Sequence, residues 1–290
     1  MSDPTPLPRR LSFSGADGLE LVADGWGSPT APPVVLLHGG GQTRHAWSRT
    51  ALALAERGHY AVSLDLRGHG ESEWSPHGRY ALEAFKDDLR AVVDDLSSPP
   101  ALIGASLGGL SALIGVGEPP ACPARALVLV DVAPRLEPGG AQRILEFMTG
   151  HPEGFRSLSE AADAIARYTR HRSRERNLKT LEKNLRRGPD GRYRWHWDPR
   201  FVSRTGPEEL RDPSRLLRAA GSLRIPTLLV RGRESDVLSH DGVAEFLAVV
   251  PHAEFADVSG AGHMVAGDRN DAFSEAVIGF LERHSAADRS

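Results

Sequence analysis

The sequence predicts an α/β fold, in which a mostly parallel, twisted sheet is flanked by helices and a helical segment is inserted after the sixth strand. Two observations predict this. Short, continuously apolar runs alternate with longer segments of helical periodicity along most of the 290 residues. Such uninterrupted apolarity is typical of strands that are buried on both faces. In addition, one interval between two of these runs is far longer than a crossover helix requires.

The expected elements follow in order. Residues 10–13 and 19–26 lie on either side of Gly15-Ala16-Asp17-Gly18 and predict a hairpin at the edge of the sheet. Buried strands are then expected at residues 34–37, 61–64, 101–103, 126–130 and 227–230, with a weaker candidate at 254–258. Crossover helices are expected at residues 46–57, 81–96, 107–116, 243–249 and 271–283.

The long interval follows the sixth strand. Three segments in it have a helical pattern, residues 141–148, 158–170 and 174–187, and Trp195-His196-Trp197 comes after them. We therefore expect three parts. Residues 1–133 form the first part of the α/β core, residues 134–212 form a helical lid, and residues 213–290 form the second part of the core.

Composition limits the partners and the compartment. The 35 basic and 38 acidic residues give a net charge of −3, which provides no general attraction to nucleic acid or to an anionic membrane. The only cysteine, Cys122, excludes an intrachain disulfide and fits a reducing compartment. The N-terminal residues lack the apolar stretch of a signal peptide, and no apolar run is long enough to cross a bilayer. We expect a cytoplasmic protein that acts on a small molecule; the oligomeric state stays open.

The strongest chemical signal is Gly104-Ala105-Ser106-Leu107-Gly108, with Gly109 after it. It follows an apolar strand and precedes an apolar helix, which is the context of a nucleophile elbow. In such an elbow the serine sits on a strained turn that projects its hydroxyl from the sheet, and the glycines let the strand and the helix approach. Ser106 is therefore the predicted nucleophile.

A serine hydroxyl needs a base, and the base needs an orienting carboxylate. His263 is the expected base, because it lies in a glycine-rich loop between the last strand and the last helix. Two aspartates stand at strand ends, Asp131 and Asp236. We favour Asp236, because it gives the chain order Ser, Asp, His. Asp131 is the alternative, with a structural role otherwise.

His38-Gly39-Gly40-Gly41 follows the strand at residues 34–37 and predicts an oxyanion hole, since glycines let backbone amides approach a substrate oxygen. The expected donors are the amides of Gly40 and Leu107. A phosphate loop is disfavoured because no Lys-Ser/Thr follows these glycines.

Three tryptophans are candidates for an apolar substrate pocket: Trp47, Trp195 and Trp197. Ordinary core packing is the alternative for each of them. His196, between the last two, is a further candidate for the site, although a surface position is the favoured interpretation. The sequence holds no metal-binding spacing, so we expect neither a metal nor a cofactor.

These motifs together resemble the lidded α/β-hydrolases, from about residue 10 to residue 283. The resemblance rests on His38-Gly39, on Trp47, on the segment from Asp65 to Ser72, on the serine elbow and on Asp236 with Gly262-His263. The spacing is similar to that of esterases, epoxide hydrolases, enol-lactonases, C–C bond hydrolases and cofactor-free perhydrolases. By resemblance, a structural turn is implied for Arg67, Gly68, Gly70 and Ser72.

Epoxide hydrolases and haloalkane dehalogenases carry an aspartate where this chain has Ser106, so the resemblance implies an acyl-enzyme on serine. We expect a serine hydrolase that cleaves a small-molecule ester or lactone. The alternatives are a C–C bond hydrolase, a perhydrolase or acyltransferase with the same triad, and a ligand-sensing protein with negligible turnover.

Overall fold

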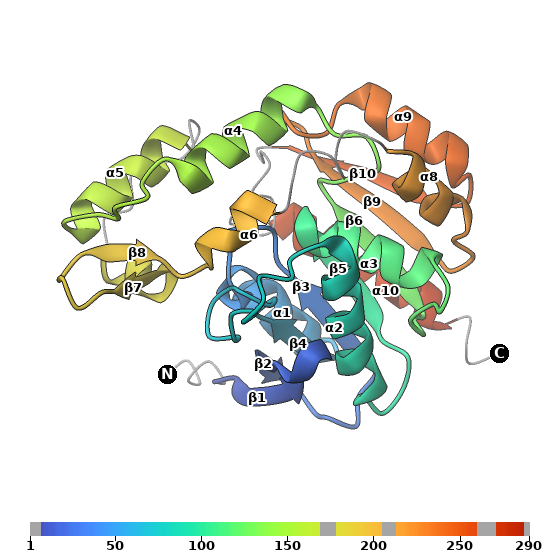
Figure 1. Cartoon of the computed structure of the whole chain (residues 1–290). Helices are drawn as coiled ribbons and strands as arrows, with labels where there is room; N and C mark the ends of the chain where they lie inside the picture. The colour runs from blue at the N-terminus through green and yellow to red at the C-terminus, as the bar shows by residue number, and fades with distance from the viewer. Residues whose placement is uncertain (1–6, 169–177, 205–212, 260–270, 287–290) are drawn as a thin grey trace.

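The computed structural model describes residues 7–168, 178–204, 213–259 and 271–286 (Figure 1). Within these residues one sheet contains eight strands in the order β1-β2-β4-β3-β5-β6-β9-β10. β1 (Arg9–Ser14) and β2 (Glu20–Trp26) form the expected antiparallel hairpin at one edge, joined through the 3₁₀ turn η1 (Ala16–Gly18). β2 also runs antiparallel to β4 (Tyr60–Leu64).

The remaining strands run parallel from β4 to the opposite edge. They are β3 (Pro33–Leu37), β5 (Ala101–Ala105), β6 (Ala126–Val130), β9 (Thr227–Gly232) and β10 (Glu254–Val258). Every apolar run that the sequence predicted to be a strand is one. All residues of β3, β5 and β6 are buried, so their continuous apolarity reflects cover on both faces of the sheet.

The strands direct alternate side chains into two cores, one on each face. Val35 and Leu37 belong to the core under α2 (Leu82–Asp94), α3 (Leu107–Gly117), α8 (Ser214–Gly221) and α9 (His240–Val249). Val34 and Leu36 belong to the core under α1 (Ser48–Glu56) and α10 (Asp271–Ala286). Figure 1 shows α2 and α3 in front of the sheet and α10 behind it.

The interval between β6 and β9 holds a group of elements, which we call the insertion (residues 134–212). Figure 1 shows most of them gathered at one side of the molecule, with α6 between this group and the core. The described elements are α4 (Pro138–Thr149), α5 (Leu158–Tyr168), the 3₁₀ helix η3 (Leu178–Asn184), β7 (Leu185–Arg187), β8 (Tyr193–Trp195) and α6 (Pro199–Arg204).

The prediction of a third helix in this interval, at residues 174–187, is wrong for residues 178–187, which the structure describes. A 3₁₀ helix and the short strand β7 stand there, and β7 pairs antiparallel with β8 so that Leu185 faces Trp195. Between the two strands Gly188-Pro189-Asp190-Gly191 forms a turn, in which the Gly188 amide donates to the Arg192 carbonyl at 2.8 Å and Gly191 has φ +77°. Glycine, proline and aspartate are turn residues, and they close a hairpin here.

No helix in the described ranges combines the length and the apolar composition that a membrane crossing requires.

Candidate functional site

Ser106 lies on a sharp turn between β5 and α3, with φ 45° and ψ −116°. This backbone conformation is rare for a residue with a side chain and stores strain. The turn is crowded, because a Cβ at Gly104 would lie 2.5 Å from the Gly108 backbone and one at Gly108 would lie 2.4 Å from the Leu37 carbonyl oxygen. The glycines are therefore required sterically. Ser106 is partly exposed although its neighbours are buried, as expected for a serine that is presented to a substrate.

The loop after β3 lies directly against this turn. A Cβ on Gly39 would lie 3.3 Å from the Ser106 Cβ, and the Gly108 amide donates to the His38 carbonyl at 3.2 Å. The glycine-rich loop and the serine turn, far apart in sequence, thus form one unit.

Side chains hold two of the three glycine amides in this loop. The Gly39 amide donates to Gln42 Oε1 at 2.9 Å, and the Gly41 amide donates to His69 Nε2 at 3.1 Å. Among the residues that the structure describes, neither the Gly40 amide nor the Leu107 amide has an acceptor. These are the two donors that the sequence predicted for an oxyanion hole.

Three buried histidines surround the loop, and each has a pKa far below the usual value. Burial lowers the pKa of His38 to about 4 and that of His69 to about 3, and it lowers that of His196 well below 6.5. All three are therefore neutral near pH 7. His196 accepts from the Gly70 amide at 2.7 Å and donates to the Gly41 carbonyl at 3.3 Å. It is 2% exposed, so the expectation of a surface histidine is wrong.

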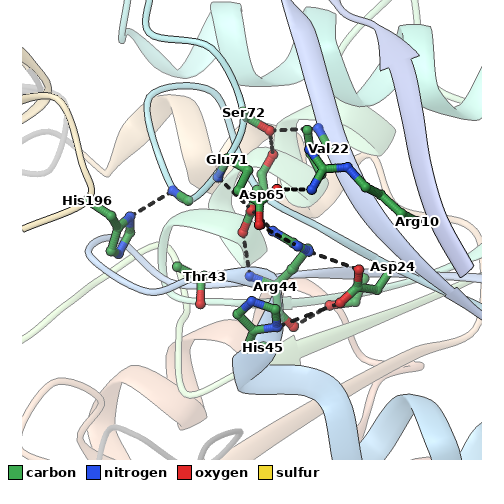
Figure 2. Close-up of polar contacts among 12 residues, drawn as sticks. Arg10, Val22, Asp24, Thr43, Arg44, His45, Asp65, Glu71, Ser72 and His196 are labelled. Atoms are coloured by element: carbon green, nitrogen blue, oxygen red, sulfur yellow. Dashed lines mark hydrogen bonds and ion pairs between the residues drawn. The ribbon is translucent and has the colours of Figure 1, made fainter. Parts of the chain in front are cut away.

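The segment from Asp65 to Ser72 is joined by hydrogen bonds to the glycine loop and to the residues that follow it. Asp65 is fully buried and accepts from the Arg44 amide at 2.6 Å and from the Glu71 amide at 2.9 Å. Figure 2 shows the Arg44 side chain among the carboxylates of Asp24, Asp65 and Glu71. Burial raises the pKa of the Asp65 carboxyl, and the neighbouring Arg44 opposes that rise.

The glycines of this segment are required for the turn. A Cβ on Gly70 would lie 2.1 Å from an Asp65 carboxylate oxygen, and Gly70 has φ +56°. Arg67 is fully buried and donates to both Asp88 oxygens, at 2.6 and 2.7 Å. Ser72 donates to the Asp65 carbonyl and accepts from the Val22 amide. These contacts are structural, which agrees with the role implied for the segment by resemblance.

The insertion contributes the apolar side chains nearest the glycine loop. Phe201 lies 3.4 Å from the position of a Cβ on Gly40, and Trp197 and Met148 lie 3.3 Å from that of a Cβ on Gly41. Trp195 stacks on Trp197 with ring centroids 4.9 Å apart. The two tryptophans are therefore part of one aromatic cluster, of which Trp197 borders the loop.

Trp47 has a different environment. It is fully buried in the core of the opposite face, 6.1 Å from the Phe273 ring, and not in the cluster of Trp195 and Trp197. Of the two roles considered for it, the structure favours core packing over a pocket wall. The reason is that the 3₁₀ turn η2 (Arg44–Trp47) carries the chain from the loop toward α1, and the side chain enters the core there.

The two aspartates considered for the acid role differ in their surroundings. Asp236 has a side chain that is 54% exposed and forms an ion pair with Arg143 on α4. Asp131 is fully buried, with φ +51°, and accepts from the Gly232 amide at 3.1 Å and from the Ser235 hydroxyl at 2.5 Å. His263, the expected base, lies outside the described residues.

Sequence reasoning did not identify Gln42, His69 and His196 as supports of the glycine loop. Only the first has a local signal, a polar residue just after the glycines. The other two reach the loop from residues 69 and 196 through the fold. Cys122 is a buried free thiol whose pKa burial raises, which agrees with an inert side chain. In the described ranges no cluster of three or more His, Cys, Asp or Glu side chains is arranged to hold a metal ion.

Comparison with known proteins adds to this geometry. Residues 34–276 match the model of the alpha/beta hydrolase family. Esterase Rv0045c of Mycobacterium tuberculosis is 32% identical over 97% of this chain and 91% of its own length. The 3-hydroxybutyrate-oligomer hydrolase of Cupriavidus necator is 31% identical over 82% of this chain and 85% of its own length.

Solved structures show the same fold. A structure of the M. tuberculosis esterase has a TM-score of 0.77 at 30% identity, covering 96% of this chain and 93% of that one. E-2-(acetamidomethylene)succinate hydrolase has a TM-score of 0.81 at 21% identity, covering 95% and 99%, which is a likeness in fold.

Proposed function

Because the chain belongs to the alpha/beta hydrolase family, we propose that it cleaves a small-molecule ester or lactone through an acyl-enzyme on Ser106. The observation that carries the proposal is the arrangement around this serine. Its side chain is presented on a strained turn, and the Gly40 and Leu107 amides stand beside it without acceptors in the described structure. Two relatives that cover most of the chain are named an esterase and an oligomer hydrolase, which also favours ester chemistry.

The proposed reaction has two steps. In the first, His263 takes the Ser106 proton, Oγ attacks the carbonyl carbon, and the two amides stabilise the oxyanion. The imidazolium then protonates the leaving alcohol, and the acyl group stays on Ser106. In the second step His263 activates water, which releases the acid and frees the serine. The carboxylate that orients His263 is one of two aspartates, Asp131 or Asp236.

The contacts around the glycine loop give each side chain a task. Gln42 and His69 hold the amides on either side of Gly40, so the Gly40 amide is fixed before the substrate arrives. Preorganised donors of this kind contribute about 10²–10³ each in rate. Burial lowers the pKa of His69 to about 3, so its Nε2 is unprotonated near pH 7 and accepts from the Gly41 amide. Phe201, Trp197 and Met148 form an apolar wall beside the loop, which favours an acyl group without charge.

The lid remains part of the proposal. We propose that residues 134–212 cover the site and select the substrate, since their aromatic side chains are the ones next to the glycine loop. The single, buried cysteine keeps the cytoplasm as the proposed compartment.

Steady-state turnover of a series of p-nitrophenyl esters and of simple lactones tests the proposal. The expected result is hydrolysis by the native chain that falls by about 10⁴-fold or more in Ser106→Ala, with unchanged circular dichroism. Equal turnover by Ser106→Ala would overturn the nucleophile. If the native chain hydrolyses none of these substrates, a C–C bond hydrolase, a perhydrolase or a ligand-sensing protein becomes the better interpretation.

A further inference from the structure

We propose that Phe201 is a specificity-determining residue that limits the length of the acyl group, and that Tyr80 and Asp198 are the positioning residues that hold it. The inference rests on the proposed function and names a substrate class for the same site, esters of short acyl groups. The observation behind it is the juxtaposition of the Phe201 ring with Gly40, whose amide is a proposed oxyanion donor.

The Phe201 ring occupies the space that a side chain at residue 40 would need. Its Cε1 and Cζ atoms, at the tip of the ring, each lie 3.4 Å from the position of a Cβ on Gly40. Apart from the chain neighbours of Gly40, no other atom of the described residues lies within 4 Å of that position. A carbonyl oxygen that accepts from the Gly40 amide lies about 3 Å from its nitrogen, so the carbon atoms bonded next to it lie close to the ring. The ring therefore limits the space that is open to the acyl chain.

The ring is held in place from the side of the core. It meets the rings of His69, Tyr80 and Phe85 edge to face, with centroids 4.8, 5.9 and 6.1 Å away. These three residues belong to the first part of the core, whereas Phe201 comes from α6 of the insertion. Phe201 is 5% exposed. The ring cannot turn away from Gly40 without losing these edge-to-face contacts.

A buried polar contact attaches the start of α6 to the core. The Tyr80 hydroxyl donates to Asp198 Oδ2 at 2.6 Å, and the Asp198 amide donates to the Gly68 carbonyl at 2.8 Å. Tyr80 and Asp198 are both 1% exposed. The Phe201 amide donates to the Asp198 carbonyl at 2.9 Å, so the residue that carries the ring is bonded to the residue that the core holds.

These contacts make α6 part of the wall of the site. Figure 1 shows α6 between the rest of the insertion and the core. Arg200 adds to the attachment, since its guanidinium donates to the Ser75 carbonyl at 2.8 Å and to the Asp198 carboxylate at 2.8 Å. A ring that is fixed in this way does not make room for a long acyl chain, and esters of short acyl groups are therefore the expected substrates.

The test measures kcat/KM for p-nitrophenyl octanoate and for p-nitrophenyl butanoate and takes the ratio of the first to the second. Leucine at residue 201 lacks the ring tip beside Gly40, so Phe201→Leu opens space there. We expect the native chain to prefer the butanoate, and the ratio to rise by about tenfold in Phe201→Leu. Both values come from one sample, so a loss of folded protein does not change the ratio.

Phe155→Leu is the matched control, because it makes the same change at another buried residue of the insertion. The Phe155 ring contacts that of Trp195, with centroids 5.0 Å apart, and does not reach the position of a Cβ on Gly40. Its ratio should stay within about twofold of the native value.

Tyr80→Phe tests the positioning role, because it removes only the hydroxyl that donates to Asp198. We expect the ratio to rise in the same direction as in Phe201→Leu and by a smaller factor. A hydroxyl with a structural role alone would change both rates alike and leave the ratio at the native value.

A native preference for the octanoate would overturn the inference, as would an unchanged ratio in Phe201→Leu. An equal rise in Phe155→Leu would also overturn it, because it marks a general loosening of the insertion. So would an effect of Phe201→Leu that follows the length of the alcohol in a series of acetate esters and not the length of the acyl group. If Phe201→Leu does not fold, Tyr80→Phe decides alone: a higher ratio supports the inference and an unchanged one overturns it. Turnover that does not depend on Ser106, or no ester hydrolysis by the native chain, would instead defeat the proposed function, so the two failures are distinguishable.

Discussion

At Ser106 the backbone is held in a conformation that a serine rarely adopts, with φ 45°. Nothing in the side chain itself favours it. The constraint comes from the neighbours, because β3, β5 and α3 meet so closely that only hydrogen fits in place of a side chain at residues 104 and 108. The strain at one residue is thus maintained by the packing of three elements.

Gly104→Ala tests this constraint. The new Cβ would lie 2.5 Å from the Gly108 backbone, so the elbow has to open. We expect the free energy of unfolding to fall by about 1–3 kcal/mol and the esterase rate to fall with it. Urea denaturation and turnover measure both.

Gly221→Ala is the matched control, since its Cβ would meet Val249 at an ordinary 3.6 Å. It should leave both quantities near the native values. A Gly104→Ala variant as stable and as active as this control would contradict the account of the elbow.

At the residue scale, part of the candidate site follows from the sequence and part of it does not. Ser106, Gly40 and Leu107 follow from a local pattern, because a strand, a turn and a helix are contiguous in the chain. The choice between Asp131 and Asp236 does not, because burial and side-chain direction arise only in the folded sheet. The position of Trp47 in the core likewise arises only in the folded chain.

At the scale of elements, neutral histidines join segments that are distant in sequence. His38 accepts from the Leu66 amide at 3.0 Å, which links the glycine loop to the turn after β4. His69, which lies in that turn, accepts a hydrogen bond from the Gly41 amide. His196 brings in the insertion, between β8 and α6, and Figure 2 shows its ring against this turn. Each link requires an unprotonated ring nitrogen as acceptor.

His196→Leu tests whether the insertion helps to hold the glycine loop. The change leaves the partly buried Gly70 amide without its acceptor, which costs about 1 kcal/mol of stability. It also removes the donor to the Gly41 carbonyl, next to the Gly40 amide. We therefore expect a fall of about tenfold in kcat with a smaller change in KM, measured by steady-state kinetics.

His77→Leu, which replaces an exposed histidine, is the control and should leave the kinetics unchanged. A His196→Leu variant that loses stability but retains kcat would show that the bridge holds the insertion without affecting the loop.

Element prediction succeeded where the apolar pattern was simple. The hairpin at the sheet edge and the buried strands follow from composition and period, as do the helices between them. The β7–β8 hairpin was missed because the basic, polar run before Gly188 has a helical pattern on its own. Its partner strand at residues 193–195 and the turn between them decide the structure.

At the scale of the whole molecule, the buried histidines make folding depend on pH. An unfolded histidine has a pKa of about 6.5, whereas burial lowers that of His38 to about 4 and that of His69 to about 3. As the pH falls below about 6.5, the unfolded chain binds protons that the folded chain does not. The free energy of unfolding should therefore fall by about 1 kcal/mol for each such histidine between pH 7 and pH 5.5.

Urea denaturation at the two pH values measures this fall, and His196→Gln should reduce it by about one histidine's share. Burial raises the pKa of Asp65 and Asp88. At pH values closer to their own pKa, protonation of these carboxyls stabilises the folded chain as the pH falls, which opposes the effect of the histidines. This is why the comparison stops at pH 5.5. A pH dependence that is the same in His196→Gln as in the native chain would contradict a neutral, buried His196.

The whole account depends on an activated Ser106, and a fluorophosphonate probe tests that most directly. The native chain and Ser106→Ala are incubated with the probe, and the intact mass of each is measured. The account predicts a single adduct on the native chain and none on Ser106→Ala. No adduct on the native chain, or an equal adduct on both, would contradict it.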